Sequence, residues 1–150
     1  MINKIIFVDF DDTLCLHKKN IYSEKYLAYN PLDICDTVYK DSIPNDKLIK
    51  YLYKKKETED CYIMLLTSAC SRMLEIKKVW CTKHCPELFD DYFAVSIDAS
   101  KTEIMKAFID RLGLDKKECL FIDDSCSDRK NAEIYGIQIL SPQIIELLEE

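Results

Sequence analysis

Short runs of apolar residues recur along the chain, separated by stretches whose apolar positions repeat every three or four residues. The runs are continuous rather than alternating, which is typical of strands buried on both faces of a sheet. They predict strands at residues 4–9, 61–67, 92–97, 118–122 and 137–140. The stretches between them predict helices at residues 46–56, 71–84, 100–112 and 128–135, and a terminal helix that begins after Ser141 and Pro142.

Strands that alternate with helices predict an α/β protein with a doubly wound parallel sheet and helices on both faces. The sequence contains only two glycines, Gly113 and Gly136, and each follows a predicted helix, where a left-handed backbone conformation often ends the helix. A chain of 150 residues is long enough for one well-buried core. We therefore expect residues 1–150 to form a single domain.

Residues 14–44 interrupt this alternation. They connect the first strand to its helix and carry Tyr22, Tyr26, Tyr29 and Tyr39 among scattered charges. The segment is too long for a simple loop and too short for a domain of its own. We expect it to form a flap or a small cap-like lid, and the alternative is a surface excursion without a functional part.

Acidic residues gather directly after the first and the fourth predicted strands. They are Asp9, Asp11, Asp12, Asp123, Asp124 and Asp128. Ligands of doubly wound sheets bind beyond the carboxyl ends of the strands, so these side chains are expected to meet at one edge of the sheet. Neighbouring carboxylates that lose water repel one another and need a cation, and oxygen ligands of this kind select a hard ion such as Mg²⁺.

Four short motifs resemble those of the haloacid dehalogenase superfamily, and they occur in the order of that family. They are Asp9-Phe10-Asp11-Asp12-Thr13, Leu65-Leu66-Thr67-Ser68, Lys101 before a helix, and Ile122-Asp123-Asp124-Ser125 with Asp128. The resemblance covers nearly the whole chain, and each motif falls on the element where the family has it. It implies a phosphatase-type hydrolase with a minimal cap and five core strands in the order 3-2-1-4-5.

The resemblance also implies a reaction. Asp9 would be the nucleophile of a Mg²⁺-dependent phosphatase and would form an aspartyl-phosphate from a phosphomonoester. Asp11 would act as general acid on the leaving oxygen and then as general base on the attacking water. Members that cleave carbon–halogen bonds lack the aspartate at the Asp11 position, so we do not expect that chemistry.

The remaining roles follow from the same motifs. Thr67 and Lys101 are implied as catalytic residues that also bind the phosphoryl group, together with Ser68. The implied protein ligands of Mg²⁺ are Asp9, the main-chain carbonyl of Asp11, Asp124 and Asp128.

Several assignments stay open or have a simpler interpretation. The family often has glycine at the position of Asp123, so the role of Asp123 is open, and we expect Asp12 to face away from the metal. Thr13 either belongs to the site or only stabilises a turn. Both histidines, His17 and His84, are expected at the surface.

Other functions fit the residues less well. A receiver domain gathers similar side chains around Mg²⁺, but its phosphorylated aspartate comes in mid-chain and its lysine late. A phosphotransferase or mutase would use the same residues as a phosphatase, and a catalytically silent binding module is a further alternative. A P-loop and a dinucleotide-binding loop are excluded because two glycines cannot build either.

The composition limits the classes of partner that we expect the protein to bind. The net charge is −6, which argues against an extended nucleic-acid surface, and no apolar stretch approaches the ~20 residues that span a bilayer. We expect a cytoplasmic protein whose eight cysteines are reduced and structural. A phosphorylated small molecule is the favoured substrate, with a phosphoprotein or a nucleic-acid end as alternatives, and no membrane partner is expected.

Overall fold

The structure is a computed structural model of the chain and describes residues 2–17 and 39–148. Its centre is a parallel sheet of five strands in the order β5-β4-β1-β6-β7. The strands are β1 (Ile5–Val8), β4 (Tyr62–Ser68), β5 (Asp91–Val95), β6 (Cys119–Ile122) and β7 (Gln138–Leu140). In chain order this arrangement is 3-2-1-4-5, so the predicted α/β fold and its strand order are confirmed.

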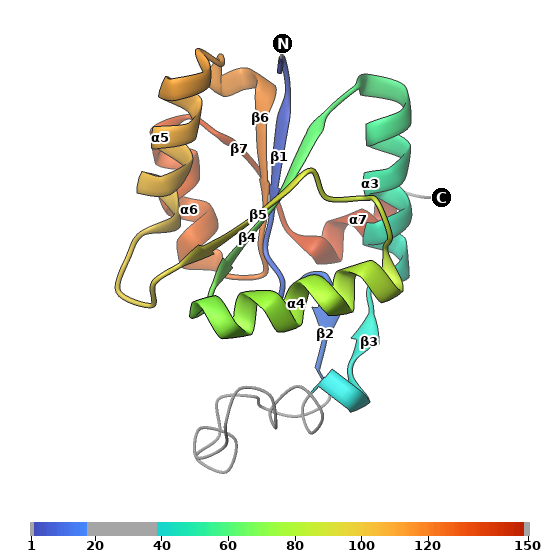
Figure 1. Ribbon diagram of the computed structural model, residues 1–150. Helices are drawn as coiled ribbons and strands as arrows, with labels where there is room; N and C mark the ends of the chain where they lie inside the picture. Colours follow the sequence, from blue (N-terminus) through green and yellow to red (C-terminus); the bar gives the residue numbers. More distant parts are fainter. Residues whose placement is uncertain (1, 18–38, 149–150) are drawn as a thin grey trace.

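Helices cover both faces of the sheet (Figure 1). One face is covered by α3 (Asp46–Glu59), α4 (Ser71–His84) and α7 (Pro142–Leu148), and the other by α5 (Lys101–Leu112) and α6 (Cys126–Tyr135). Two 3₁₀ turns, η1 (Tyr39–Asp41) and η2 (Lys116–Glu118), complete the helical segments within the described residues. The predicted helices are all present, although α3 ends three residues later and α6 begins two residues earlier than the periodicity indicated.

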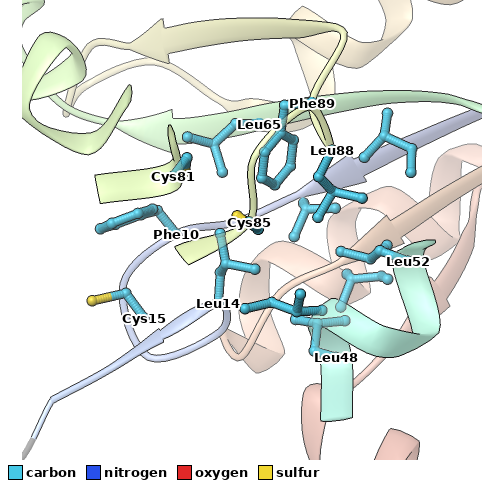
Figure 2. Close-up of a cluster of buried hydrophobic side chains, with 14 of the residues drawn as sticks. Phe10, Leu14, Cys15, Leu48, Leu52, Leu65, Cys81, Cys85, Leu88 and Phe89 are labelled. Carbon is cyan, nitrogen blue, oxygen red and sulfur yellow. The ribbon is translucent and has the colours of Figure 1, made fainter. Parts of the chain in front are cut away.

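The apolar runs explain why both faces of the sheet are buried. Along β1, Ile6 and Val8 pack under α3 and α4, whereas Ile5 and Phe7 pack under α5 and α6. Figure 2 shows Leu48 and Leu52 of α3 directed into the same cluster as Leu14 and Leu88. Since successive side chains of a strand point to opposite faces, only a run without polar positions can support both layers.

Polar caps set the helix starts that border the site. The Asn45 side chain accepts the Leu48 amide at the start of α3, and the Ser100 side chain accepts the Glu103 amide at the start of α5. Gly136 ends α6 at a φ of 111°, the left-handed conformation that was predicted for it. The cap at Ser100 fixes the start of α5, whose first residue is Lys101.

A short antiparallel ladder lies at the carboxyl end of the sheet, where β2 (Cys15–Leu16) pairs with β3 (Ile43–Pro44) (Figure 1). These strands are the two ends of the segment 14–44. Its middle, 18–38, lies outside the described residues, so the flap at 14–44 stays a prediction. Next to β3, the Asn45 side-chain amide donates to the Thr13 carbonyl at 3.0 Å and ties the ladder to the loop after β1.

Two expectations from the composition, the lack of a membrane-spanning stretch and reduced cysteines, can be compared with the described residues. None of the helices in the described part is both long enough and apolar enough to span a membrane. The cysteines in residues 2–17 and 39–148 have free thiols.

Candidate active site

A polar cavity of about 210 Å³ opens at the carboxyl ends of β1, β4 and β6. All the residues that the motifs implied as catalytic, substrate-binding or metal-binding line it. The full lining is Asp9, Asp11, Asp12, Thr67, Ser68, Lys101, Asp123, Asp124, Ser125 and Asp128. Residues more than a hundred positions apart meet here because parallel strands end at the same edge of the sheet.

Three carboxylates form the centre of the cavity. Each of Asp9, Asp123 and Asp124 offers an oxygen, and these oxygens all lie within 4.8 Å of one another. The structure thus brings Asp9 and Asp124 together as the motifs implied, and it adds Asp123, whose role the sequence left open. Asp11 and Asp128 line the same cavity but are not members of this group, so their assignment as metal ligands remains a prediction.

Lys101 lies between two of these carboxylates. Its Nζ is 2.8 Å from Asp9 Oδ1 and 2.9 Å from Asp123 Oδ2, and its side chain is almost fully buried. Burial lowers the pKa of the Lys101 ammonium, but the two carboxylates outweigh it and raise that pKa above its usual value. The ammonium therefore stays charged and stabilises the aspartates that it contacts.

One ammonium does not neutralise three carboxylates. Burial and the neighbouring Asp9 raise the pKa of Asp123 from 3.8 to about 7. Burial and the hydrogen bond with Asp9 raise the pKa of Asp124 from 3.8 to about 6. Three carboxylates with one contacting ammonium leave an excess of negative charge in the centre, which a divalent cation would relieve.

The Thr13 hydroxyl joins the two acidic loops. It lies 2.9 Å from Asp9 Oδ2 and 3.1 Å from Asp124 Oδ1, and it accepts the Asp124 amide at 3.0 Å. The side chain is fully buried. Of the two interpretations of Thr13, the structure favours a place within the site, since the hydroxyl orients both carboxylates.

A second polar network surrounds Asp11. Lys77 Nζ lies 2.9 Å from Asp11 Oδ2, His17 Nε2 lies 2.8 Å from Asp11 Oδ1, and the Tyr39 hydroxyl donates to the same Oδ1 at 3.2 Å. Burial raises the pKa of Asp11, but His17 and Lys77 outweigh it and leave that pKa below 3.8. Asp11 is therefore ionised in the free site.

Sequence reasoning missed His17 and Lys77. The expectation that His17 is a surface residue was wrong: its side chain is 3% exposed because it packs against Asp11 and the Tyr39 ring. Lys77 is 2% exposed, and a signal for it was present in the sequence. It falls on the helical stripe of Met73 and Trp80, where a charged residue needs a buried partner.

No protein-family model matches the chain, and no curated protein sequence matches it. Solved structures of haloacid dehalogenase-type proteins do share its architecture. A subfamily IA hydrolase of Geobacter sulfurreducens has a TM-score of 0.65 at 14% identity, with 93% of this chain and 89% of that chain covered. A family enzyme of Bacteroides thetaiotaomicron, solved as a magnesium complex, has a TM-score of 0.62 at 20% identity, with 99% of both chains covered.

A haloacid dehalogenase-like hydrolase of Streptococcus pneumoniae gives a third likeness, with a TM-score of 0.61 at 15% identity over 93% of this chain and 84% of that one. The aligned regions span nearly the full length of all three solved chains. At sequence identities this low, the likeness establishes a shared arrangement of helices and strands and does not establish a substrate. The protein therefore has the fold of the haloacid dehalogenase superfamily, as its four motifs implied.

Proposed function

We propose that the protein is a Mg²⁺-dependent phosphatase that hydrolyses a phosphomonoester through an aspartyl-phosphate on Asp9. The observation that carries this proposal is the setting of the Asp9 carboxylate. It lies at the cavity, with Lys101 on one oxygen and Thr13 on the other, beside two further aspartates. Such a carboxylate is fixed in direction and open to a ligand, as a nucleophile must be.

The donor set fits a magnesium ion. Asp9, Asp123 and Asp124 supply hard oxygen atoms within 4.8 Å of one another, and burial together with the neighbouring Asp9 raises the pKa values of Asp123 and Asp124. These residues would hold the ion, with Asp128 and the Asp11 carbonyl completing the ligands implied by the motifs. When bound, Mg²⁺ would neutralise phosphate charge so that a carboxylate can approach phosphorus. The related enzyme of Bacteroides thetaiotaomicron has been solved with magnesium and inorganic phosphate.

The protein groups divide the reaction between them. Thr67 and Lys101 contact the phosphoryl oxygens while Asp9 attacks phosphorus from the side opposite the leaving oxygen. The bond from phosphorus to the leaving oxygen breaks, and that oxygen takes a proton from Asp11. The approaching phosphoryl dianion favours this protonated form, because a nearby anion raises the pKa of a carboxyl. Asp11, ionised again, then removes a proton from the water that frees Asp9.

The favoured substrate is a phosphorylated small molecule. Among the described residues that line the cavity, Lys101 is the one cation, and it already contacts Asp9 and Asp123. A phosphodiester strand needs several cations along its path, and the lining offers none for further phosphates. A single phosphoryl group bound beside Mg²⁺ has no such requirement.

The test replaces the nucleophile and removes the metal. We expect Asp9→Asn to lower kcat on p-nitrophenyl phosphate by at least about 10³-fold, since the amide cannot attack phosphorus. EDTA should stop wild-type turnover, and MgCl₂ should restore it. Asp110→Asn, on the exposed face of α5, is the matched control and should keep wild-type rates.

Thermal unfolding by circular dichroism checks that Asp9→Asn is folded. Trapping of ³²P from a labelled phosphomonoester on wild-type protein, and its absence on Asp9→Asn, identifies the covalent intermediate. A folded Asp9→Asn variant that turns over at near-normal rates, or turnover that continues in EDTA, would refute the proposal.

A further inference from the structure

Lys77 is a buried charge in the middle of α4, on the side of the helix that packs against the sheet. Its side chain is 2% exposed, and its neighbours on the same stripe, Ile76 and Trp80, belong to the apolar core. Taking an ammonium out of water is costly unless its partners compensate. An apolar residue would fill the same place without that cost, so a function for the ammonium should be sought in what it contacts.

The ammonium joins two of the four motifs. Nζ lies 2.9 Å from Asp11 Oδ2 and 2.7 Å from Thr67 Oγ1. The ring of Phe10, which follows Asp9 in the chain, lies 5.2 Å from Nζ. Lys77 thus connects the proposed general acid and base at the end of β1 with the phosphate-binding hydroxyl at the end of β4.

Hydrogen-bond direction gives this contact a chemical consequence. An ammonium has three donors and no acceptor, so Thr67 Oγ1 must accept a hydrogen bond from Lys77. The hydroxyl proton of Thr67 is then directed elsewhere, and the described residues provide no acceptor for it. Since Thr67 lines the cavity, that proton is available to a phosphoryl oxygen.

The same ammonium fixes the second group. His17 and Tyr39 contact Asp11 Oδ1, whereas Lys77 contacts Oδ2, so both oxygens of the carboxylate are held in place. Without Lys77, the Thr67 hydroxyl and the Asp11 carboxylate would lose the donor that they share, and the Thr67 proton would be free to turn toward this carboxylate. The hydroxyl would then turn away from the phosphoryl group.

Given the phosphatase function proposed above, we infer that Lys77 is a positioning residue of the reaction. It directs the Thr67 hydroxyl toward the phosphoryl group and keeps the Asp11 carboxylate in place for proton transfer. It acts through Thr67 and Asp11 and does not itself contact the phosphoryl group.

The test is Lys77→Met, which keeps an unbranched side chain one atom shorter and removes the donors. Steady-state hydrolysis of p-nitrophenyl phosphate in MgCl₂ measures kcat and KM, and competition measures Ki for inorganic phosphate. We expect Ki to rise by about 10- to 100-fold, the value of one strong hydrogen bond, and kcat to fall as well. Lys78→Met removes the neighbouring lysine, which pairs with Glu75 at the surface, and should match the wild type.

A double-mutant cycle separates positioning from a structural role. If Lys77 acts on phosphate through the Thr67 hydroxyl, Lys77→Met should raise Ki in the wild type and in Thr67→Ser but leave it unchanged in Thr67→Val. A merely structural lysine would raise Ki equally in all three backgrounds, and that result would overturn the inference. Should Lys77→Met fail to fold, Lys77→Gln, whose amide is polar but uncharged, takes its place in the same cycle.

The outcomes also distinguish this inference from the proposed function. A wild-type protein that hydrolyses no phosphomonoester and takes up no ³²P would refute both. An active wild type with Lys77→Met at wild-type kcat, KM and Ki would refute the role of Lys77 alone and leave the phosphatase assignment intact.

Discussion

In the absence of divalent metal, the free energy of unfolding should fall as the pH rises from about 4 to about 7. The cause is the acidic centre, where folding raises the pKa of Asp123 from 3.8 to about 7 and that of Asp124 from 3.8 to about 6. Between the unfolded and folded pKa values, the folded state binds more protons than the unfolded state. The free energy of unfolding therefore falls as the pH rises through this window, and the loss is complete above about pH 7.

The size of the effect follows from the same shifts. For Asp123, the rise from 3.8 to about 7 corresponds to about 4 kcal/mol at 1.36 kcal/mol per unit. We take this as the total for the centre, because Asp123 and Asp124 are raised in part by the same Asp9. The lowered pKa of Asp11 acts only below 3.8, and the raised pKa of Lys101 only above 10.5, so neither contributes in this window. For a chain of 150 residues the difference is about 10 °C in Tm.

The assay is thermal unfolding at pH 5, 6, 7 and 8, in EDTA and in saturating MgCl₂. In EDTA, Tm should fall toward pH 8, whereas Mg²⁺ should stabilise the protein most at pH 8, where the carboxylates are free of protons. Asp124→Asn is the matched variant. The substitution removes one negative charge, and the side-chain amide of asparagine can still contact Thr13. It should flatten the slope in EDTA and weaken the response to Mg²⁺. A wild-type Tm in EDTA that is constant or rises between pH 5 and pH 8 would refute this reasoning.

Two further predictions concern residues that shape the loops around the site. Asn45→Ala should lower the free energy of unfolding by about 2 kcal/mol, since it removes both the cap of α3 and the bond to the Thr13 carbonyl. Ser100→Ala, which removes a cap alone, should lower the free energy of unfolding by about 1 kcal/mol. Urea titration measures both losses, and equal losses for the two variants would contradict the role of the Thr13 bond. Gly136→Ala should be more destabilising than Gly113→Ala, because a Cβ at Gly136 would lie 3.2 Å from Lys116 whereas Gly113 has open space. Each substitution costs about 1 kcal/mol because alanine disfavours the left-handed conformation. Calorimetry measures the free energy of unfolding of both variants, and a larger loss for Gly113→Ala would contradict this order.

The sequence by itself determined the layers of the fold and most of the cavity lining. Continuous apolar runs of this length between helical patterns indicate strands buried on both faces, and strands joined through helices in one sheet run parallel. Parallel strands end at one edge, so Asp9, Thr67 and Asp124 had to meet there once the runs before them were identified. Lys101 was implied by the resemblance of its motif to the superfamily, and Ser100 predicted the start of the helix that carries it.

Only the tertiary structure decided which side chains complete the charge balance. Periodicity shows that α4 has an apolar stripe, but the rotation and tilt of the packed helix determine that Lys77, rather than a neighbour, reaches Asp11 and Thr67. His17 follows β2, and its approach to Asp11 depends on how the loop after β1 turns back, which local patterns do not encode. Such contacts join residues distant in the chain through a few hydrogen bonds. Their geometry depends on how the helices and strands pack, so the sequence pattern alone does not predict them.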